Sequence, residues 1–121
     1  MANKKILIID DDRTNTLLVQ SRLQSSQYEV IYASDGVSGL EKVKSEKPDL
    51  IILDVEMPRM NGYTFMNEFK KMDLSQTIPV VVLTSHSENQ PIFGLKGVRG
   101  YLIKPIDMTV LEEKLKQCLG Q

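Results

Sequence analysis

The sequence predicts an α/β fold in which a doubly wound, five-stranded parallel sheet is covered by helices on both faces. Short apolar runs recur along the chain, and segments with the spacing of an amphipathic helix lie between them. Strands that alternate with helices imply right-handed βαβ crossovers, which make the strands parallel. No low-complexity tract or linker interrupts this alternation, so residues 1–121 are expected to form a single domain.

The strands are predicted from apolar runs that are short and rich in β-branched residues. These runs cover residues 6–9, 30–33, 50–53, 78–83 and 100–103. Three of the runs lack polar alternation, as expected of parallel strands that are buried on both faces.

Helical spacing of apolar residues predicts helices between the runs and after the last one. The apolar stripes are Leu18, Val19 and Leu23; Val37, Leu40 and Val43; Phe65, Met66, Phe69 and Met72; and Leu111, Leu115 and Cys118. Pro48 follows the second stripe, and either Asp107 or a capping box of Thr109 and Glu112 is expected to begin the last helix.

The fourth helix, expected within residues 87–96, is the exception to this regular pattern. The segment contains Pro91 and Gly94, which disfavour a helix interior. We therefore expect a short or irregular fourth helix.

Composition and charge narrow the classes of function. The net charge of −1 does not favour a domain that grips nucleic acid or an anionic membrane through its own surface. Cys118 is the only cysteine, which excludes an intramolecular disulfide and a cysteine-based zinc cage. No stretch reaches the length of a bilayer span, and the first apolar run is too short for a signal peptide. We expect a cytoplasmic protein.

Chemically distinctive side chains follow four of the predicted strands. They are Asp10, Asp11 and Asp12 after the first strand, Asp54 after the third, Thr84 and Ser85 after the fourth, and Lys104 after the fifth. Ligands bind to such sheets beyond the carboxyl ends of the strands. These side chains are therefore expected to converge on one edge of the sheet.

Carboxylates gathered at one edge repel one another and require a counter-charge. Mg²⁺ would supply it, because this cation prefers carboxylates, waters and phosphate oxygens. A lysine and a hydroxyl group nearby are the parts that stabilise a transferring phosphoryl group. Asp54 is then interpreted as a nucleophile that forms an aspartyl phosphate. Each position alone could be ordinary strand-end polarity, and Asp10–Asp12 alone could cap a helix, so the interpretation rests on their combination.

The chain resembles the receiver domains of two-component response regulators, of the chemotaxis-regulator kind, over its whole length. The matching stretches are Ile8–Asp12, Leu53–Pro58 with Asn61 and Gly62, Thr84–Ser85 and Gly100–Pro105. The resemblance, rather than the spacing, implies a flavodoxin-like three-layer sandwich with strand order 2-1-3-4-5. The segment between Thr84 and Lys104 is shorter than the family pattern, and the gap falls in the fourth helix.

The resemblance implies that Mg²⁺ is the cofactor. Asp11 and Asp54 would bind Mg²⁺ directly, together with the backbone carbonyl of Glu56, and Asp10 would act through water. The phosphoryl group on Asp54 would come from a sensor histidine kinase or a histidine phosphotransfer protein. Glu56 is further expected to tune the lifetime of the phosphorylated form, and His86 either shares this role or is a solvated loop residue.

The resemblance also implies a switch. Lys104 and Thr84 would hold the phosphoryl oxygens, and Ser85 would leave room for them. Thr84 would then move toward the phosphoryl group and Tyr101 would turn inward. This would change the face formed by the fourth helix, the fifth strand and the fifth helix. The Lys104–Pro105 peptide bond is expected to be cis.

The protein is thus expected to be a phosphoprotein in signal transduction rather than an enzyme, although it would promote its own phosphorylation and dephosphorylation at aspartate. It would control an unknown downstream protein or pass phosphate along a phosphorelay, with no direct contact to nucleic acid or membrane. Kinases of this family dock mainly on the first helix and the loop after the fifth strand, so Leu17, Leu18 and Ile106 are expected contacts. The protein could be free-standing or part of a larger regulator.

The main alternative is a small α/β phosphatase that also forms an aspartyl phosphate. Glu56 lies two residues past Asp54, where such enzymes place a second acid. However, the acidic pair follows the first strand here, and no cap region for a substrate is present. A nucleotide binder is disfavoured because three acids stand where a phosphate loop would be. A degenerate receiver that signals without phosphate is disfavoured because the site residues are intact.

Overall fold

The computed structural model describes residues 3–54, 62–84 and 98–120. Its sheet contains five strands in the order β2-β1-β3-β4-β5, and every pairing is parallel. The strands are β1 (Lys5–Ile9), β2 (Glu29–Ala33), β3 (Leu50–Asp54), β4 (Val80–Thr84) and β5 (Val98–Ile103). The predicted strands and their order are confirmed.

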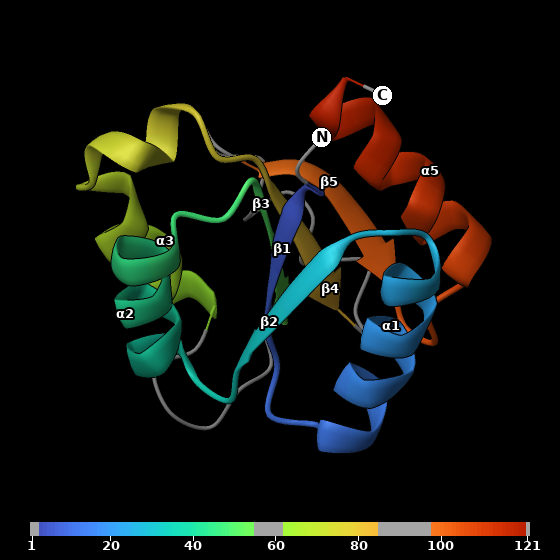
Figure 1. The fold of residues 1–121 in the computed structure, drawn as a ribbon. Helices are drawn as coiled ribbons and strands as arrows, with labels where there is room; N and C mark the ends of the chain where they lie inside the picture. The colour runs from blue at the N-terminus through green and yellow to red at the C-terminus, as the bar shows by residue number, and fades with distance from the viewer. Residues whose placement is uncertain (1–2, 55–61, 85–97, 121) are drawn as a thin grey trace.

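Helices cover both faces of the sheet and complete a three-layer sandwich (Figure 1). The helices α1 (Arg13–Ser25) and α5 (Met108–Leu119) lie on one face. The helices α2 (Gly36–Glu46) and α3 (Gly62–Lys70) lie on the other, and the short 3₁₀ helix η1 (Asp73–Gln76) follows α3. The doubly wound α/β fold is confirmed. The predicted short or irregular fourth helix lies outside the described residues.

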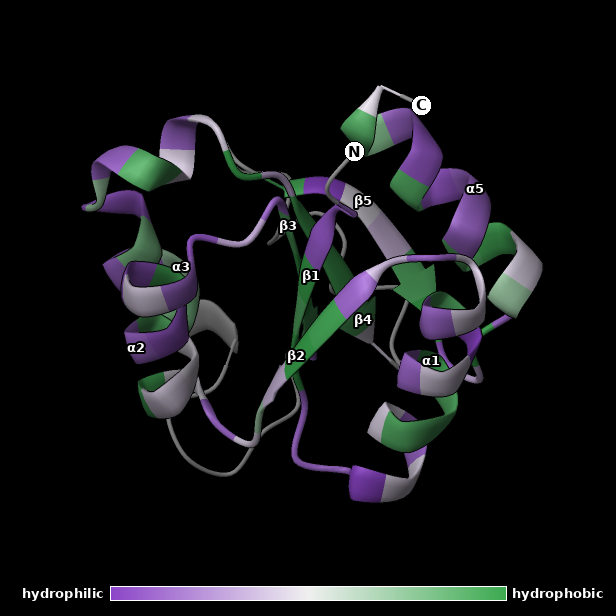
Figure 2. Cartoon of the chain, in the orientation of Figure 1, coloured by the Kyte–Doolittle hydropathy of each residue, from purple (hydrophilic) through white to green (hydrophobic). Residues whose placement is uncertain are grey.

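The core consists of two layers, one on each face of the sheet. Alternate residues of β1, β3 and β4 enter opposite layers, so nearly every residue of these strands is buried. The layer under α2 and α3 includes Leu7, Ile51, Val82, Phe65 and Phe69, and the layer under α1 and α5 includes Ile8, Ile52, Val81, Leu23 and Leu115. Figure 2 shows the sheet as a hydrophobic centre between helices that carry both hydrophilic and hydrophobic residues. Burial on both faces explains why the strand runs lack polar alternation.

The helices predicted from the apolar stripes are present, but two residues of those stripes face solvent and not the core. Leu18 on α1 is 59% exposed and Val37 on α2 is 44% exposed. In α1, Thr16 is buried instead, because its hydroxyl donates to the Asp12 carbonyl oxygen at 2.8 Å and so remains satisfied. In α2, Gly39 faces the sheet, and a Cβ there would lie 2.6 Å from Ile9 Cδ1. A glycine at this position lets α2 approach β1 closely.

Aspartates begin three of the helices. Asp12 caps α1, Asp35 caps α2 and Asp107 caps α5 through hydrogen bonds to backbone N–H groups. At α5, Asp107 Oδ1 accepts from Thr109 N at 2.9 Å and from Val110 N at 3.2 Å. The prediction that Asp107 begins this helix is therefore confirmed.

Candidate functional site

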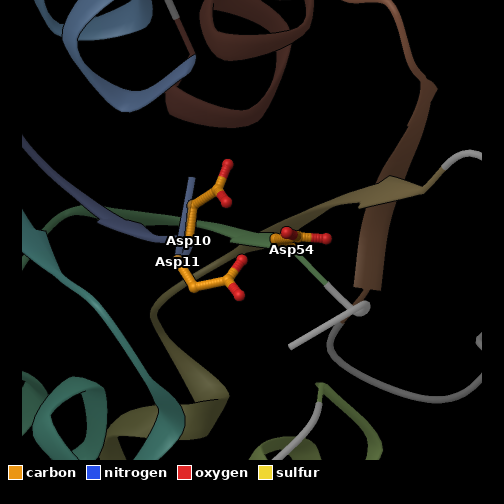
Figure 3. A group of neighbouring side chains, drawn as sticks. All are labelled: Asp10, Asp11 and Asp54. Atoms are coloured by element: carbon orange, nitrogen blue, oxygen red, sulfur yellow. The ribbon is translucent and has the colours of Figure 1, made fainter. Parts of the chain in front are cut away.

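The carboxyl ends of β1 and β3 bring three aspartates together. Ile9 lies opposite Leu53 in the β1–β3 pairing, so Asp10 and Asp54 follow at neighbouring positions of the sheet edge. One carboxylate oxygen from each of Asp10, Asp11 and Asp54 lies within 4.8 Å of the other two (Figure 3). The predicted convergence of acids from separate strands is present in the structure.

Two of these three acids are buried. Asp10 and Asp54 are 0% and 1% exposed, whereas Asp11 is exposed. Burial is the main reason why the pKa of Asp10 is raised to about 6, and the nearby Asp54 raises it further. Two hydrogen bonds oppose this effect, because Asp12 N donates to Asp10 Oδ1 and the Asn15 side-chain amide donates to Asp10 Oδ2, each at 2.9 Å. The cluster is thus electrostatically costly without a cation.

Lys104 reaches this cluster from the end of β5. Thr84 lies opposite Ile103 in the β4–β5 pairing, and Lys104 N donates to the Thr84 carbonyl oxygen at 2.8 Å. The Lys104 Nζ atom lies 3.1 Å from Asp54 Oδ1, and the lysine side chain remains 26% exposed. The Lys104–Pro105 peptide bond is cis, as predicted.

Thr84 and Tyr101, the predicted switch residues, stand on neighbouring strands. Thr84 is fully buried at the end of β4, and Tyr101 lies opposite Val82 on β5. The Tyr101 ring packs against the core layer under α2 and α3, and its hydroxyl is buried without a hydrogen-bond partner in the part of the chain that the structure describes. Burial raises the pKa of this hydroxyl. The side chain is therefore oriented inward in this structure.

Comparison with known proteins decides the family. Residues 6–116 match the family described as the response regulator receiver domain. The chain belongs to this family. It is a signalling domain of two-component systems, and this membership does not favour the phosphatase alternative.

The receiver domain is similar to proteins of different lengths. It is 37% identical to the alkaline phosphatase synthesis transcriptional regulatory protein PhoP of Bacillus subtilis, covering 97% of this chain and 49% of PhoP. The chain therefore spans about half the length of this curated relative. Among solved structures, chemotaxis protein CheY4 of Vibrio cholerae has a TM-score of 0.91 at 32% identity, covering 98% of this chain and 100% of CheY4. TrrA of Thermotoga maritima, solved in complex with Mg²⁺-BeF, has a TM-score of 0.86 at 31% identity, covering 96% of this chain and 99% of that chain.

The acidic cluster of the receiver domain fits Mg²⁺. Its donors are carboxylate oxygens, which are hard ligands, and two of the three carboxylates are buried with their charges close together. Such a donor set favours a divalent cation that prefers oxygen. The structure thus supports the predicted metal chemistry at Asp10, Asp11 and Asp54.

Three of the predicted site residues cannot be placed. Glu56, Ser85 and His86 lie outside the described residues. Their predicted roles as a carbonyl ligand, a small neighbour and tuning residues stay predictions.

Sequence reasoning missed Asn15, which the structure places against Asp10. The sequence feature that could have identified Asn15 is a side-chain amide in the first turn of the helix that follows the acidic run. The sequence alone does not show which way this side chain turns. Arg13, in the same turn, lies over the Tyr32 ring with its guanidinium carbon 4.4 Å from the ring centroid.

The expected docking residues Leu17 and Leu18 on α1 are 49% and 59% exposed, and Ile106 is partly buried. Their contact with a kinase stays a prediction. Among the described helices, none combines the length and the apolar character that crossing a membrane requires.

Proposed function

We propose that this receiver domain accepts a phosphoryl group on Asp54 from a phosphohistidine of a sensor histidine kinase or of a histidine phosphotransfer protein. The observation that supports this most is the contact of Lys104 Nζ with Asp54 Oδ1 at 3.1 Å, within the cluster that Asp54 forms with Asp10 and Asp11. Phosphoryl transfer requires a nucleophile, a cation and a set of metal ligands, and all three are found at one edge of the sheet.

The metal ligands would be Asp11 and Asp54, with the backbone carbonyl of Glu56. Asp10 would act through water. Each Asp10 oxygen already accepts a hydrogen bond from the protein, which suits a carboxylate that orients water rather than one that contacts the cation. Bound Mg²⁺ would neutralise the carboxylates and supply positive charge to the phosphoryl oxygens.

In the transfer step, an Asp54 carboxylate oxygen forms a bond to phosphorus while the bond between phosphorus and the imidazole nitrogen breaks. The electron pair of the broken bond leaves with the imidazole of the donor histidine. Lys104 would hold a phosphoryl oxygen through its ammonium group, and Thr84 would hold another through its hydroxyl. Hydrolysis of the resulting acyl phosphate would reset the domain, at a rate that Glu56 and His86 would tune.

Movements of Thr84 and Tyr101 would make the phosphorylated state recognisable to a partner. A Thr84 hydroxyl that moves toward the phosphoryl group would leave space beside β5, and the inward position of Tyr101 would fill it. In the present structure the Tyr101 hydroxyl is buried without a partner in the described segments, which suits a side chain with more than one position. The switch would change the face formed by the fourth helix, β5 and α5.

The downstream partner is an unknown protein or the next member of a phosphorelay. We propose a cytoplasmic location and no direct contact of this domain with nucleic acid or membrane. PhoP is named a transcriptional regulatory protein, but the chain matches only 49% of it. A DNA-related activity of a longer regulator would therefore arise outside the matched region.

Incubation with Mg²⁺ and acetyl phosphate, followed by intact mass spectrometry, tests this function. Wild-type protein should gain one phosphoryl group that is labile in base, and Asp54→Ala should gain none. Asp73→Asn is the matched control, because it removes an exposed acid from η1 without touching the site. An adduct of equal yield in Asp54→Ala would contradict the assignment, and multiple turnover of phosphate esters would favour the phosphatase.

A further inference from the structure

The Asp10 carboxylate is held at both of its oxygens by the start of α1. Oδ1 accepts a hydrogen bond from Asp12 N, and Oδ2 accepts one from Asn15 Nδ2, each at 2.9 Å. A carboxylate can only accept, so the amide nitrogen of Asn15 must face it. The two donors approach different oxygens and together fix the plane of the carboxylate.

Asn15 is itself fixed by the same turn. Its backbone N–H donates to Asp12 Oδ1 at 3.1 Å, which is the capping bond of α1. Thr16 closes the turn, because both its N–H and its hydroxyl donate to the Asp12 carbonyl oxygen, at 2.9 and 2.8 Å. Asp10, Asp12 and Asn15 thus form a closed ring of hydrogen bonds.

A fixed carboxylate plane matters for the cation that the site fits. The terminal torsion of an aspartate is broad, so a carboxylate without such donors rotates easily. Mg²⁺ demands near-ideal octahedral geometry, whereas Ca²⁺ accepts variable and flexible coordination. Because Asp10 would act through a water ligand, its orientation would determine where that water is held, and this matters more for Mg²⁺ than for Ca²⁺.

We propose that Asn15 is a positioning residue of the metal site, which holds the Asp10 carboxylate in the orientation required for Mg²⁺ and thereby favours Mg²⁺ over Ca²⁺. The proposal rests on the proposed function, because it assumes that the acidic cluster binds Mg²⁺. Asn15 does not contact the cation or the phosphoryl group. It acts through Asp10.

The test compares the dissociation constants of Mg²⁺ and Ca²⁺ by isothermal titration calorimetry. Asn15→Leu keeps the approximate shape of the side chain and removes the donor, and Asn15→Ala is a second variant that favours the helix. Both should weaken Mg²⁺ binding by about tenfold, the lower end of the effect of losing a hydrogen-bond partner of a metal ligand, because Asn15 acts through the outer-sphere Asp10. Ca²⁺ binding should weaken by a clearly smaller factor. Thr14→Ala, an exposed neighbour in the same turn, should change neither constant.

The free energy of unfolding in EDTA, measured by urea titration, controls for stability. A merely structural role of Asn15 would lower the affinities for the two cations by the same factor, and this result would overturn the proposal. Unchanged Mg²⁺ binding in both Asn15 variants would also overturn it and would leave the proposed function intact. Wild-type protein that binds no Mg²⁺ would overturn the proposed function as well.

Discussion

The burial of Asp10 makes a quantitative prediction about the metal-free protein. Asp10→Asn replaces a buried acid, which has Asp54 and Asp11 beside it, with a neutral group of nearly the same shape. In EDTA this substitution should raise the free energy of unfolding at neutral pH, although it removes a residue of the proposed site. The physical reason is that no metal ion is then bound, so the charge of Asp10 is penalised by burial and by the neighbouring Asp54.

The magnitude follows from the pKa of Asp10. This pKa is raised from 3.8 to about 6, mainly by burial. At about 1.4 kcal/mol per pKa unit, the charged carboxylate costs on the order of 3 kcal/mol at neutral pH. Asparagine retains only one acceptor oxygen for the two N–H donors from Asp12 and Asn15, and the lost hydrogen bond offsets part of this gain. The expected net gain is about 1–3 kcal/mol.

The free energy of unfolding of the metal-free protein should depend on pH with a definite sign. Between about pH 4 and pH 6 the native state retains a proton on Asp10 that the unfolded state releases, so native stability falls as pH rises through this window. The Asp10→Asn variant has no titrating carboxyl group at this position. The stability difference between variant and wild type should therefore be small below about pH 4 and complete above about pH 7.

Urea unfolding in EDTA, followed by circular dichroism, provides the measurement. Asp12→Asn is the matched control, because it removes a charge two residues away while asparagine still caps α1. An equal gain in Asp12→Asn, or no gain in Asp10→Asn above about pH 7, would refute the reasoning. Saturating Mg²⁺ should reduce or reverse the difference, because the wild type then gains the free energy of binding.

Three further predictions concern packing and charge. Gly39→Ala should lower the free energy of unfolding, measured in urea, by about 1 kcal/mol. The new Cβ would crowd the buried Ile9 side chain, and this cost should exceed the gain from the higher helix propensity of alanine. A stabilised variant would contradict this. Arg22 Nε lies 2.6 Å from Glu112 Oε1, and a double-mutant cycle with alanine at both positions should give a coupling of about 0.2–1 kcal/mol. Since the Arg22 hydrogen bond lowers the pKa of Glu112, this coupling should be present at neutral pH and disappear in acid as Glu112 becomes protonated. Lys104→Met should lower the free energy of unfolding in EDTA by about 2 kcal/mol. The loss should be smaller in saturating Mg²⁺, because the metal ion then balances the acids. An equal loss in both conditions would argue against a shared charge cluster.

Helix orientation shows where prediction from the sequence stops. The spacing of Val19 and Leu23 is enough to predict α1, but it does not decide whether Leu18 or Thr16 completes the buried face. Thr16 is buried because a backbone carbonyl within its own helix satisfies its hydroxyl. Val37 is exposed because α2 turns Gly39 toward β1. These choices depend on the surface against which each helix packs.

The β4–β5 pairing is another feature that the sequence does not predict. Val80 lies opposite Val98 and Val81 lies opposite Gly100, so Arg99 is an additional residue in β5. This irregularity sets the register in which Thr84 meets Ile103 and Lys104 follows. Register depends on the partner strand, which a single run of apolar residues does not specify.

The sequence by itself determined the strands and the polar residues that end them, because a fully buried parallel strand must consist of apolar residues and must end where it meets water. Once the strands are parallel, Asp10, Asp54 and Lys104 have to share one edge of the sheet. Only the tertiary structure decided that Lys104 contacts Asp54 and that Asn15 holds Asp10. These contacts depend on side-chain orientation and strand register, which are set by packing between segments distant in the sequence.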